Sequence, residues 1–305
     1  MKKIILFSTI CLLLPLWSVV AQELAVNVKG REYSLYQQAS EDPGAVKILN
    51  LRGKFLKQIP GDIDKFRNVE VLSFMKNELE EVHPTVFTLT NLKELNLSYN
   101  QLDTVPAQIS QLIHLVTLSA SYNQLQELPV NLSSMETLEI LHLNNNMLKK
   151  LPADFSHLSH LVHADFSFNQ LTSLPDNFGA LSNLYQLDLQ NNHFTKLPED
   201  ICHLKNIRTL NLDQNKIGQL PGKIGNMKSL KVLVLSNNAI KKLPSSMTDL
   251  SNLEILYLTS NQLKRLPKNI QGWRSLKTLI ALDNQFSEKE KKRIRKELPG
   301  VDVRL

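Results

Sequence analysis

The chain has 305 residues, of which 42% are hydrophobic, and its 35 lysines and arginines exceed 29 aspartates and glutamates to give a formal net charge of +6. A positive charge this small does not indicate a nucleic-acid-binding protein. With only two cysteines, Cys11 and Cys202, the chain cannot be built on a network of disulfides.

Residues 1–21 are predicted to be a secretory signal peptide. Two lysines precede an apolar stretch at residues 4–17, and small residues ending at Ala21 form a cleavage site. An uncleaved N-terminal anchor is the alternative. Cleavage would remove both lysines, which lowers the net charge by two, to +4, and would leave Cys202 as the single cysteine. An internal disulfide would then be impossible.

Residues 22–45 are expected to cap the N-terminal end of the fold that follows. Within this segment, residues 32–40 are predicted to form a short helix. The sequence Asp42-Pro43-Gly44 is typical of a turn and would end that helix.

A 23-residue unit recurs eleven times between residues 46 and 286 without an insertion or a deletion. Its frame is L-x-x-L-x-L-x-x-N-x-L-x-x-L-P-x-x-I-x-x-L-x-x, and self-similarity at such a period indicates a solenoid. The asparagine position, here called the ladder position, holds Lys54 in the first unit and then Asn77, Asn100, Asn123, Asn146, Asn169, Asn192, Asn215, Asn238, Asn261 and Asn284. A proline column runs in step with it and is interrupted only by His83.

Each part of the frame has a physical interpretation. Leu95 and Leu97 alternate with polar residues, which is typical of a strand with one buried face. The ladder amide follows the strand, where it can satisfy backbone groups in a turn. Apolar residues three apart after the proline, such as Ile109 and Leu112, predict a short 3₁₀ or helical turn. We expect the last ladder amide, Asn284, to contribute less than a central one, because the frame dissolves into the C-terminal cap there.

The frame resembles the leucine-rich repeat family, specifically the 23-residue type with a Leu-Pro step found in scribble-like proteins and in many bacterial exported proteins. The resemblance covers residues 46–286. It implies an α/β fold, a horseshoe-shaped solenoid with a parallel β-sheet on the concave face and short 3₁₀ or helical turns on the convex face. Animal extracellular members usually carry cysteine-rich caps. The absence of such caps and the Met-Lys-Lys start favour a bacterial exported protein.

Residues 287–305 are expected to close the C-terminal end of the sheet with a helix and a strand. Ser287 and Glu290 form a capping-box pattern that starts the helix, which is predicted to reach about Leu298. Alternating residues at 301–305 predict a last strand. The predicted elements use up the chain, so we expect no separate catalytic domain and no enzymatic activity.

The positions that the frame leaves free are the candidates for function. Three columns, which lie six, four and two residues before each ladder position, are expected to point outward and line the concave sheet. Along the chain these columns are first small and polar, then acidic with histidine, then apolar. The predicted partner-binding residues come from the last two zones: His142, His163, Asp165, Asp188, Gln190, Asp213, Val234, Ile255 and Tyr257.

The acidic zone should bring His142, Asp165 and Asp188 onto consecutive strands, with His163 on the same face. Three interpretations remain open: a hydrated polar surface, contacts with a partner that has a basic or hydrogen-bond-donating centre, or a bound divalent metal. A metal would require side chains on strands about 4.8 Å apart to lean together, and no metal ligand is assigned. No serine or cysteine is placed to pair with a histidine, so no catalytic residue and no cofactor is assigned.

The apolar zone comprises Val232, Val234, Ile255, Tyr257 and Ile280. Apolar residues on a face that strands normally present to solvent indicate a contact patch. The alternative is that the C-terminal cap covers them.

Basic residues gather in the two columns after the ladder turn and on the C-terminal helix. Those after the turn are Lys149, Lys150, Lys196, Lys241, Lys242, Lys264 and Arg265. Nucleic-acid binding would favour aromatic residues between such charges, and none are interleaved. A solvated face is one interpretation, and contact with an anionic cell-surface polymer or a lipid headgroup is the other.

The sequence therefore predicts a non-catalytic module that binds a protein or peptide on its concave face outside the cytoplasm, in the periplasm, at the cell surface or in the extracellular medium. We expect a monomer with no nucleic-acid partner and no integral membrane segment after signal cleavage. A passive structural component of the envelope or matrix and an enzyme with an unrecognised site are the alternatives.

Overall fold

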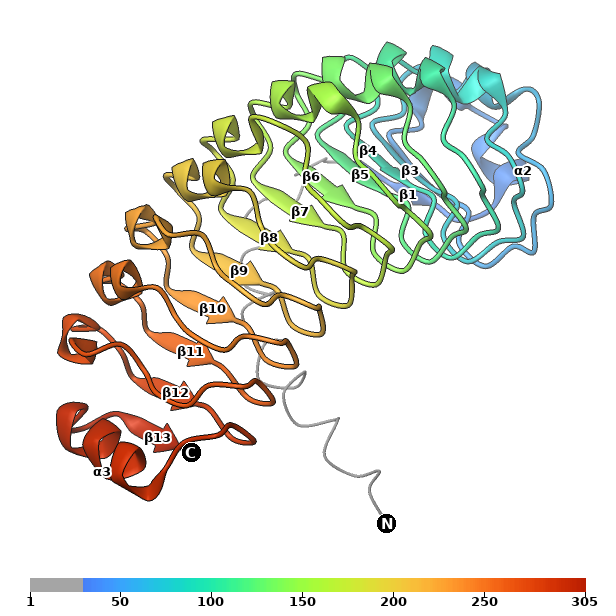
Figure 1. Ribbon diagram of the computed structural model, residues 1–305. Helices are drawn as coiled ribbons and strands as arrows, with labels where there is room; N and C mark the ends of the chain where they lie inside the picture. The colour runs from blue at the N-terminus through green and yellow to red at the C-terminus, as the bar shows by residue number, and fades with distance from the viewer. Residues whose placement is uncertain (1–29) are drawn as a thin grey trace.

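The computed structural model describes residues 30–305, which form a curved solenoid of stacked coils (Figure 1). The predicted signal peptide, and residues 22–29 of the expected N-terminal cap, lie outside the described residues. In the part of the chain that is described, no helix is both long and apolar enough to cross a membrane.

Within residues 30–305, thirteen parallel strands follow one another in chain order and form one sheet. They are β1 (Glu32–Tyr33), β2 (Ile48–Asn50), β3 (Val71–Ser73), β4 (Glu94–Asn96), β5 (Thr117–Ser119), β6 (Ile140–His142), β7 (His163–Asp165), β8 (Gln186–Asp188), β9 (Thr209–Asn211), β10 (Val232–Val234), β11 (Ile255–Tyr257), β12 (Thr278–Ile280) and β13 (Asp302–Arg304). The predicted solenoid with a parallel sheet is confirmed. The repeats supply β2 to β12, and one further strand extends the sheet at each end.

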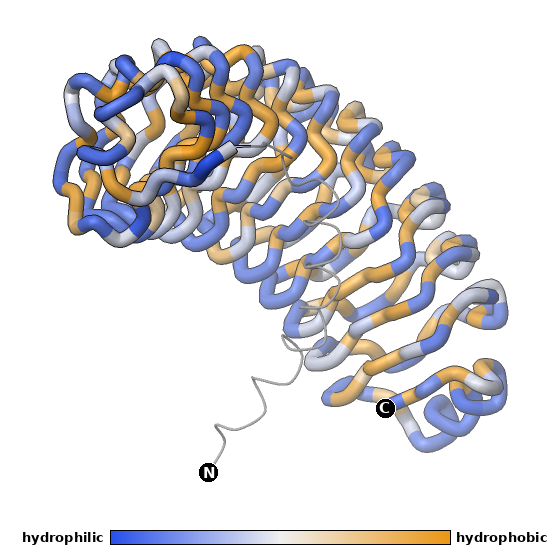
Figure 2. The backbone as a smooth tube through the Cα atoms, turned by 180° about the vertical axis from the view of Figure 1, so that it is seen from behind, coloured by the Kyte–Doolittle hydropathy of each residue, from blue (hydrophilic) through white to orange (hydrophobic). Residues whose placement is uncertain are grey.

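Alternating side chains build the core of every coil. Leu95 in β4 and Leu97 just after it are fully buried, whereas the neighbours of Leu95 in the strand are partly exposed. Figure 2 shows hydrophobic residues recurring in coil after coil. They form one continuous core from Ala39 to Leu298. A single coil cannot cover its own leucines, so the stack as a whole is the stable unit.

The ladder asparagines join each coil to the one before it. The Asn169 Oδ1 accepts a hydrogen bond of 2.9 Å from the Leu148 amide, and its Nδ2 donates to the carbonyl of Leu143 at 3.0 Å. Both residues belong to the preceding coil. The same Nδ2 also donates to the Phe166 carbonyl of its own coil at 3.1 Å. The amide therefore satisfies backbone groups that the turn leaves without a strand partner.

The last ladder residue keeps this set of partners. The Asn284 Oδ1 accepts from the Leu263 amide at 3.0 Å, and its Nδ2 donates to the carbonyls of Leu258 at 2.9 Å and Ala281 at 3.1 Å. The ladder side chain therefore loses no hydrogen-bond partner at this end. Asn284 is half-buried, as Asn238 also is, whereas Asn169 is buried and its backbone amide donates to the Asn191 carbonyl at 3.2 Å.

The residue before each ladder asparagine lies in the left-handed region of backbone space. Its φ is 59° at Tyr99 and 56° at Tyr122, for example. The frame predicts a turn here but not its left-handed backbone, because only the first unit has glycine, Gly53, in this column. For a non-glycine residue such a conformation costs about 1–3 kcal/mol, and the surrounding hydrogen bonds must hold it in place. The rings of these two tyrosines stack on adjacent coils with centroids 4.1 Å apart.

Short 3₁₀ turns follow the outer side of the curved sheet (Figure 1). They are η1 (Pro43–Ala45), η2 (Ile63–Lys65), η3 (Pro84–Thr88), η4 (Ala107–Gln111), η5 (Val130–Ser134), η6 (Ala153–His157), η7 (Phe178–Ala180), η8 (Glu199–His203), η9 (Ile224–Asn226), η10 (Ser245–Asp249) and η11 (Ile270–Gly272). The predicted apolar residue after the proline points inward, as Ile109 does in η4. His83 replaces the proline before η3, and its Nδ1 accepts from the Thr85 amide at 3.4 Å.

The two ends of the sheet are closed differently. At the N-terminal end the helix α2 (Tyr36–Ala39) is shorter than the predicted one, because Glu32 and Tyr33 are extended and pair with β2. At the C-terminal end α3 (Glu288–Glu297) starts where Ser287 Oγ accepts from the Glu290 amide at 3.2 Å. The Glu290 carboxylate does not complete a capping box, since it accepts from the Leu266 amide at 2.9 Å.

Candidate functional site

The middle concave column forms one continuous row, because the strands pair in register. Neighbours along this row are His142, Asp165, Asp188, Asn211, Val234, Tyr257 and Ile280. His163 begins β7 and pairs with Gln186 of β8. Gln190 and Asp213 lie just beyond the ends of β8 and β9, and their side chains are 3.3 Å apart. The structure thus brings the predicted residues together on one face of the sheet.

The apolar end of this row is a hydrophobic cluster of its own. Val232, Val234 and Tyr257 are buried, and the half-buried Ile255 and Ile280 pack against them. None of the five belongs to the continuous core of the solenoid. Since the frame places them on the opposite side of the strands from the core leucines, we refer to them as the concave apolar cluster.

The C-terminal cap lies at the edge of the cluster. Helix α3 packs against η11 on the outer side of the coil, and β13 continues the sheet beside β12. Through that pairing the exposed Arg304 becomes the register partner of Ile280. The cap therefore borders the cluster at Ile280, and the charges of its Arg304 and Asp302 reach Tyr257.

The acidic part of the row is a hydrogen-bonded network. The Asp165 Oδ1 accepts from the amide of Ser167 at 2.9 Å and from its hydroxyl at 2.7 Å. Asp188 accepts from the Gln190 amide at 2.8 Å through one carboxylate oxygen and from Asn211 Nδ2 at 2.9 Å through the other. Both carboxylates are held by the residue two positions later in the chain, and that of Asp188 is also held by Asn211 of the next coil.

Asp213 extends the network toward the apolar cluster. Its Oδ1 accepts from Asn237 Nδ2 at 2.8 Å, and its Oδ2 accepts from Gln190 Nε2 at 3.3 Å. Asn211 donates in turn to the Gln190 side-chain oxygen at 3.3 Å. Gln190 therefore connects Asn211, which binds Asp188, to Asp213.

The acidic zone is buried, which corrects the expectation of a hydrated outward surface. Asp165, Asp188 and Asp213 are 5%, 4% and 7% exposed. Parallel strands stand about 4.8 Å apart, so side chains of adjacent coils on one face shield one another. His163 is buried as well, and His142 is half-buried.

Burial raises the pKa values of the aspartates in this zone and lowers those of the histidines. It raises the pKa of Asp165 to about 6, and burial together with the nearby Asp165 charge raises the pKa of Asp188 well above its usual value. Burial also lowers the pKa of His142 to about 4, with a smaller contribution from His163, and lowers that of His163 to about 4. Because these side chains are removed from water, the charged form of each is less stable than its neutral form. At neutral pH both imidazoles are therefore neutral.

The chemistry that these groups can perform is recognition through hydrogen bonds. The described residues include no group of three or more histidine, cysteine, aspartate or glutamate side chains arranged to hold a metal ion. Cys202 is buried in η8, and burial raises the pKa of its thiol to about 12, so it is not a ready nucleophile. Two buried side-chain atoms of this face, the His163 Nε2 and the Ser236 Oγ, have no hydrogen-bond partner among the described residues.

Several members of the site were not recognisable from the sequence. Asn211 and Asn237 bind the carboxylates of the acidic zone, and Ser167 caps that of Asp165. All three occur in a chain rich in asparagine and serine, so their identity alone carried no signal. Their pairing with an acidic residue one coil away, 23 or 24 positions earlier for the two asparagines, is the pattern that could have found them.

Models of leucine-rich repeats match the chain along much of its length. The model described as leucine-rich repeat region matches residues 198–301, and two models described as leucine rich repeat match residues 67–125 and 165–217, and residues 137–158. The chain belongs to the leucine-rich repeat family. A search of curated proteins found no match.

Solved structures with similar folds include two receptors. A TDR receptor is 26% identical, with a TM-score of 0.75, over 87% of this chain and 48% of that one. The plant peptide hormone receptor RGFR1, solved in complex with RGF2, is 26% identical with a TM-score of 0.66, over 85% of this chain and 46% of that one. This leucine-rich repeat chain therefore spans less than half the length of either receptor chain.

A leucine-rich repeat protein from Leptospira interrogans is also similar. It is 25% identical over 91% of this chain and 100% of that one, with a TM-score of 0.49.

Proposed function

We propose that this leucine-rich repeat protein is a non-catalytic binding module that engages a protein or peptide on its concave face. The concave apolar cluster carries the proposal. The frame already fills the core with leucines, so Val232, Val234 and Tyr257 are not needed to close the solenoid. Apolar and aromatic side chains grouped at the centre of a surface usually supply most of the energy of an interface.

The polar network gives the proposed interface its selectivity. Side-chain hydrogen bonds of Gln190, Asp213 and Asn237 extend the acidic zone to the coil that carries Val232 and Val234. Because the network fixes these groups before a partner arrives, little side-chain freedom is lost on binding. The acidic residues would then act as oriented hydrogen-bond acceptors, and the partner would present donors or a basic centre to them.

The similar receptors support the same class of function. RGFR1 is a peptide hormone receptor whose structure contains RGF2. Coils of this kind expose free positions along one curved face, and such surfaces suit extended or folded polypeptides. We infer a protein or peptide partner rather than a nucleic acid, and a monomeric protein.

We also propose where the protein acts and how its chain is divided. Residues 1–21 would be a signal peptide, residues 22–45 and 287–305 the caps, and residues 46–286 repeats of the 23-residue Leu-Pro type seen in scribble-like and bacterial exported proteins. The protein would be exported to the periplasm, the cell surface or the extracellular medium. Mass spectrometry of the native protein tests this, and an intact Met1 in a cytosolic fraction would contradict it.

The partner-binding proposal is tested by quantitative capture from a native envelope fraction. The wild-type protein should retain a saturable protein ligand. Ile255→Ala should speed its dissociation, because the half-buried Ile255 offers apolar contact area. Tyr257→Ala should do so indirectly, because the buried Tyr257 belongs to the cluster against which Ile255 packs. Val130→Ala is the matched control, since Val130 is 65% exposed on η5 at the outer side of the solenoid. Melting curves must show that each variant is folded.

Loss of the ligand in Val130→Ala, with no change in the two concave variants, would place the interface elsewhere. The absence of any saturable ligand would favour the passive structural role instead.

A further inference from the structure

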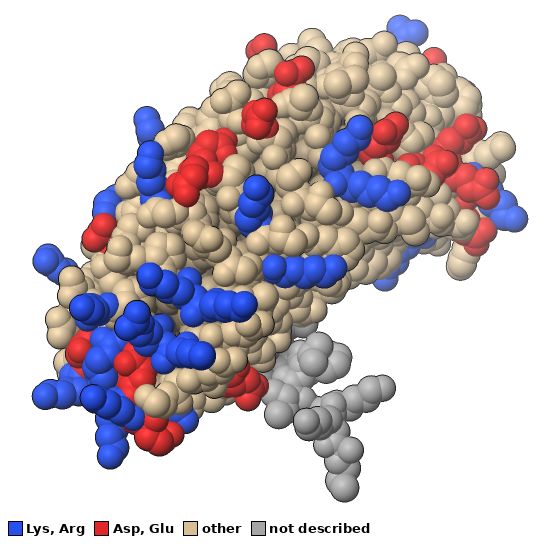
Figure 3. Space-filling model, in the orientation of Figure 1, with Lys and Arg blue, Asp and Glu red and all other residues tan. Residues whose placement is uncertain are grey.

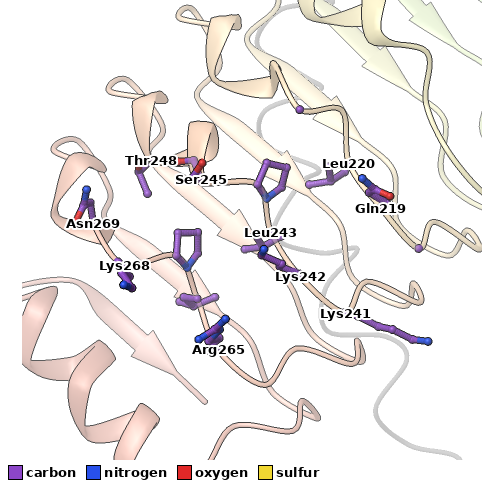
Figure 4. A pocket seen from close by; sticks show the side chains of 15 residues that line it. Gln219, Leu220, Lys241, Lys242, Leu243, Ser245, Thr248, Arg265, Lys268 and Asn269 are labelled. Carbon is purple, nitrogen blue, oxygen red and sulfur yellow. Dashed lines mark hydrogen bonds between the residues drawn. The ribbon is translucent and has the colours of Figure 1, made fainter.

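An open groove of about 930 Å³ lies on the flank of the solenoid, away from the concave row. It crosses three consecutive coils, at residues 218–222, 241–248 and 265–269, between the ladder turns and the 3₁₀ turns η9 to η11 (Figure 4). None of the residues proposed above to bind a protein partner lines it. The concave apolar cluster and this groove are thus separate surfaces.

Four cationic side chains line the groove. Lys241, Lys242, Arg265 and Lys268 are all exposed, and none of them forms an ion pair among the described residues. Figure 3 shows lysine and arginine gathered over these C-terminal coils and α3. Uncompensated like charges on adjacent coils raise the local positive potential and attract anions.

The acidic residues nearest to the groove are already engaged. The Glu290 carboxylate, which lies close enough to Arg265 to feel its charge, binds Arg293 at 2.7 Å and the Leu266 amide at 2.9 Å. At the other end the Glu199 carboxylate accepts from the Gly222 amide at 2.7 Å. Neither carboxylate neutralises the four cations directly.

The remaining lining offers hydrogen-bonding side chains beside the half-buried Pro244 and Pro267. The side chains of Gln219, Ser245 and Asn269 are exposed and form no hydrogen bond within the described residues. The apolar floor is closed to a ligand, since Leu220 and Leu243 are each only 2% exposed. The groove therefore presents charge, hydrogen-bonding groups and two prolines, and its leucines are not open to a ligand as apolar anchors.

We propose that this groove binds a linear acidic polysaccharide. Carboxylate or sulfate groups along the chain would contact the four cations, and its hydroxyl groups would pair with Gln219, Ser245 and Asn269. A groove that crosses successive coils at about 4.8 Å intervals suits an extended polymer with repeated charges.

Other anionic partners fit the lining less well. A protein interface normally includes a buried apolar anchor, and the floor offers none. Single-stranded nucleic acid is usually held by stacking on aromatic side chains, and no aromatic residue lines the groove. A membrane surface is planar, whereas the lining residues follow a groove across three coils.

Binding of the purified protein to heparin and to alginate tests the proposal. These polymers carry sulfate and carboxylate groups, and dextran serves as the neutral comparison. We expect both acidic polymers to bind with affinity that falls as salt rises, because exposed charges are screened. Lys241→Ala/Lys242→Ala should weaken binding by about tenfold. Each exposed ionic contact contributes less than a tenfold change in affinity, and the double variant removes two of them.

The matched control is Lys149→Ala/Lys150→Ala. These lysines are also exposed and also lie third and fourth after a ladder asparagine, so the control removes the same charge from the same place in a coil outside the groove. It should leave the affinity almost unchanged. Lys241→Arg/Lys242→Arg should restore binding, which separates lost charge from lost folding.

Three results would overturn the proposal. The first is an equal loss of affinity in the Lys149/Lys150 control, which would indicate non-specific attraction. The second is binding to dextran as tight as binding to the acidic polymers. The third is tighter binding, dependent on Lys241 and Lys242, to vesicles of anionic phospholipid or to polyglutamate, which would assign the groove to a membrane or an acidic protein.

Discussion

Asp165 and Asp188 are register partners on the adjacent strands β7 and β8, and both carboxyl groups are buried on the concave face. Two carboxylates in this arrangement repel each other and have lost most of their hydration, so the ionised pair is costly. The imidazoles of His142 and His163, which belong to the same zone, resist protonation for the same reason. Removing a buried acid should therefore stabilise the protein relative to wild type at high pH, and removing a buried histidine should do so at low pH.

Asp165→Asn should stabilise the protein above pH 6. The pKa of Asp165 rises from 3.8 to about 6 on folding, so the wild type loses stability as pH rises through this window. The variant does not, and its amide oxygen can still accept from Ser167. We expect no difference near pH 3 and a gain of up to about 3 kcal/mol at pH 7.5 in urea unfolding. A constant difference at all pH values would show that ionisation is not the cause.

His163→Gln should have the opposite pH dependence. Burial lowers the pKa of His163 from 6.5 to about 4, so the wild type loses stability as pH falls from 6.5 to 4. The variant lacks this loss and should gain up to about 3 kcal/mol relative to wild type at pH 4. The same urea series measures it. A gain confined to pH above 7 would contradict the assignment.

Asn169→Ala and Asn284→Ala should destabilise the protein by similar amounts. Each removes the only acceptor of a buried amide, that of Leu148 or Leu263, and an orphaned buried group costs about 1–3 kcal/mol. Each variant also removes a donor from a carbonyl of its own coil, that of Phe166 or Ala281, so the two lose equivalent side-chain hydrogen bonds.

Asn183→Ala is the control for the ladder variants, because its side chain makes one exposed hydrogen bond of 2.8 Å to the Ser159 carbonyl. Denaturant unfolding should show a much smaller effect there. A loss at Asn169 several times that at Asn284 would mean that burial outweighs the number of partners.

Gly225→Ala should be far more damaging than Gly61→Ala. A Cβ at position 225 would lie 2.0 Å from the Ser246 carbonyl oxygen of the next coil, whereas at position 61 it would meet nothing within 4 Å. Overpacking against backbone costs about 1–3 kcal/mol or more, while a compatible glycine replacement is neutral or stabilises by up to about 1 kcal/mol. Thermal unfolding of the two variants provides the comparison, and equal melting temperatures would contradict it.

Deletion of residues 287–305 should cause aggregation rather than a modest loss of stability. The cut removes β13 from the edge of β12 and uncovers apolar residues that pack against Ile294 and Leu298. An unpaired strand edge over an exposed core is a template for association. Light scattering at increasing concentration measures the effect. The control Arg295→Ala, on the exposed side of α3, should remain monomeric. A truncated protein that also stays monomeric would show that the cap is dispensable.

The sequence by itself determined the coil. A strict 23-residue period repeats the same local choices in every unit, so the pattern alone assigns Leu95, Leu97, Ile109 and the ladder asparagine their places in the coil. The parallel sheet, the register that brings His142 beside Asp165, and the outer 3₁₀ turns follow from that period, because one coil specifies its neighbour.

Only the tertiary structure decided how the free positions are used. Whether Asp165 is hydrated or buried, whether Tyr257 joins the core or a separate cluster, and whether Lys242 and Arg265 line one groove depend on side chains contributed by neighbouring coils. These residues are about 23 positions apart in sequence and a few ångströms apart in space. The frame constrains the backbone that carries them but not their mutual shielding, which arises from the packing of one coil against the next.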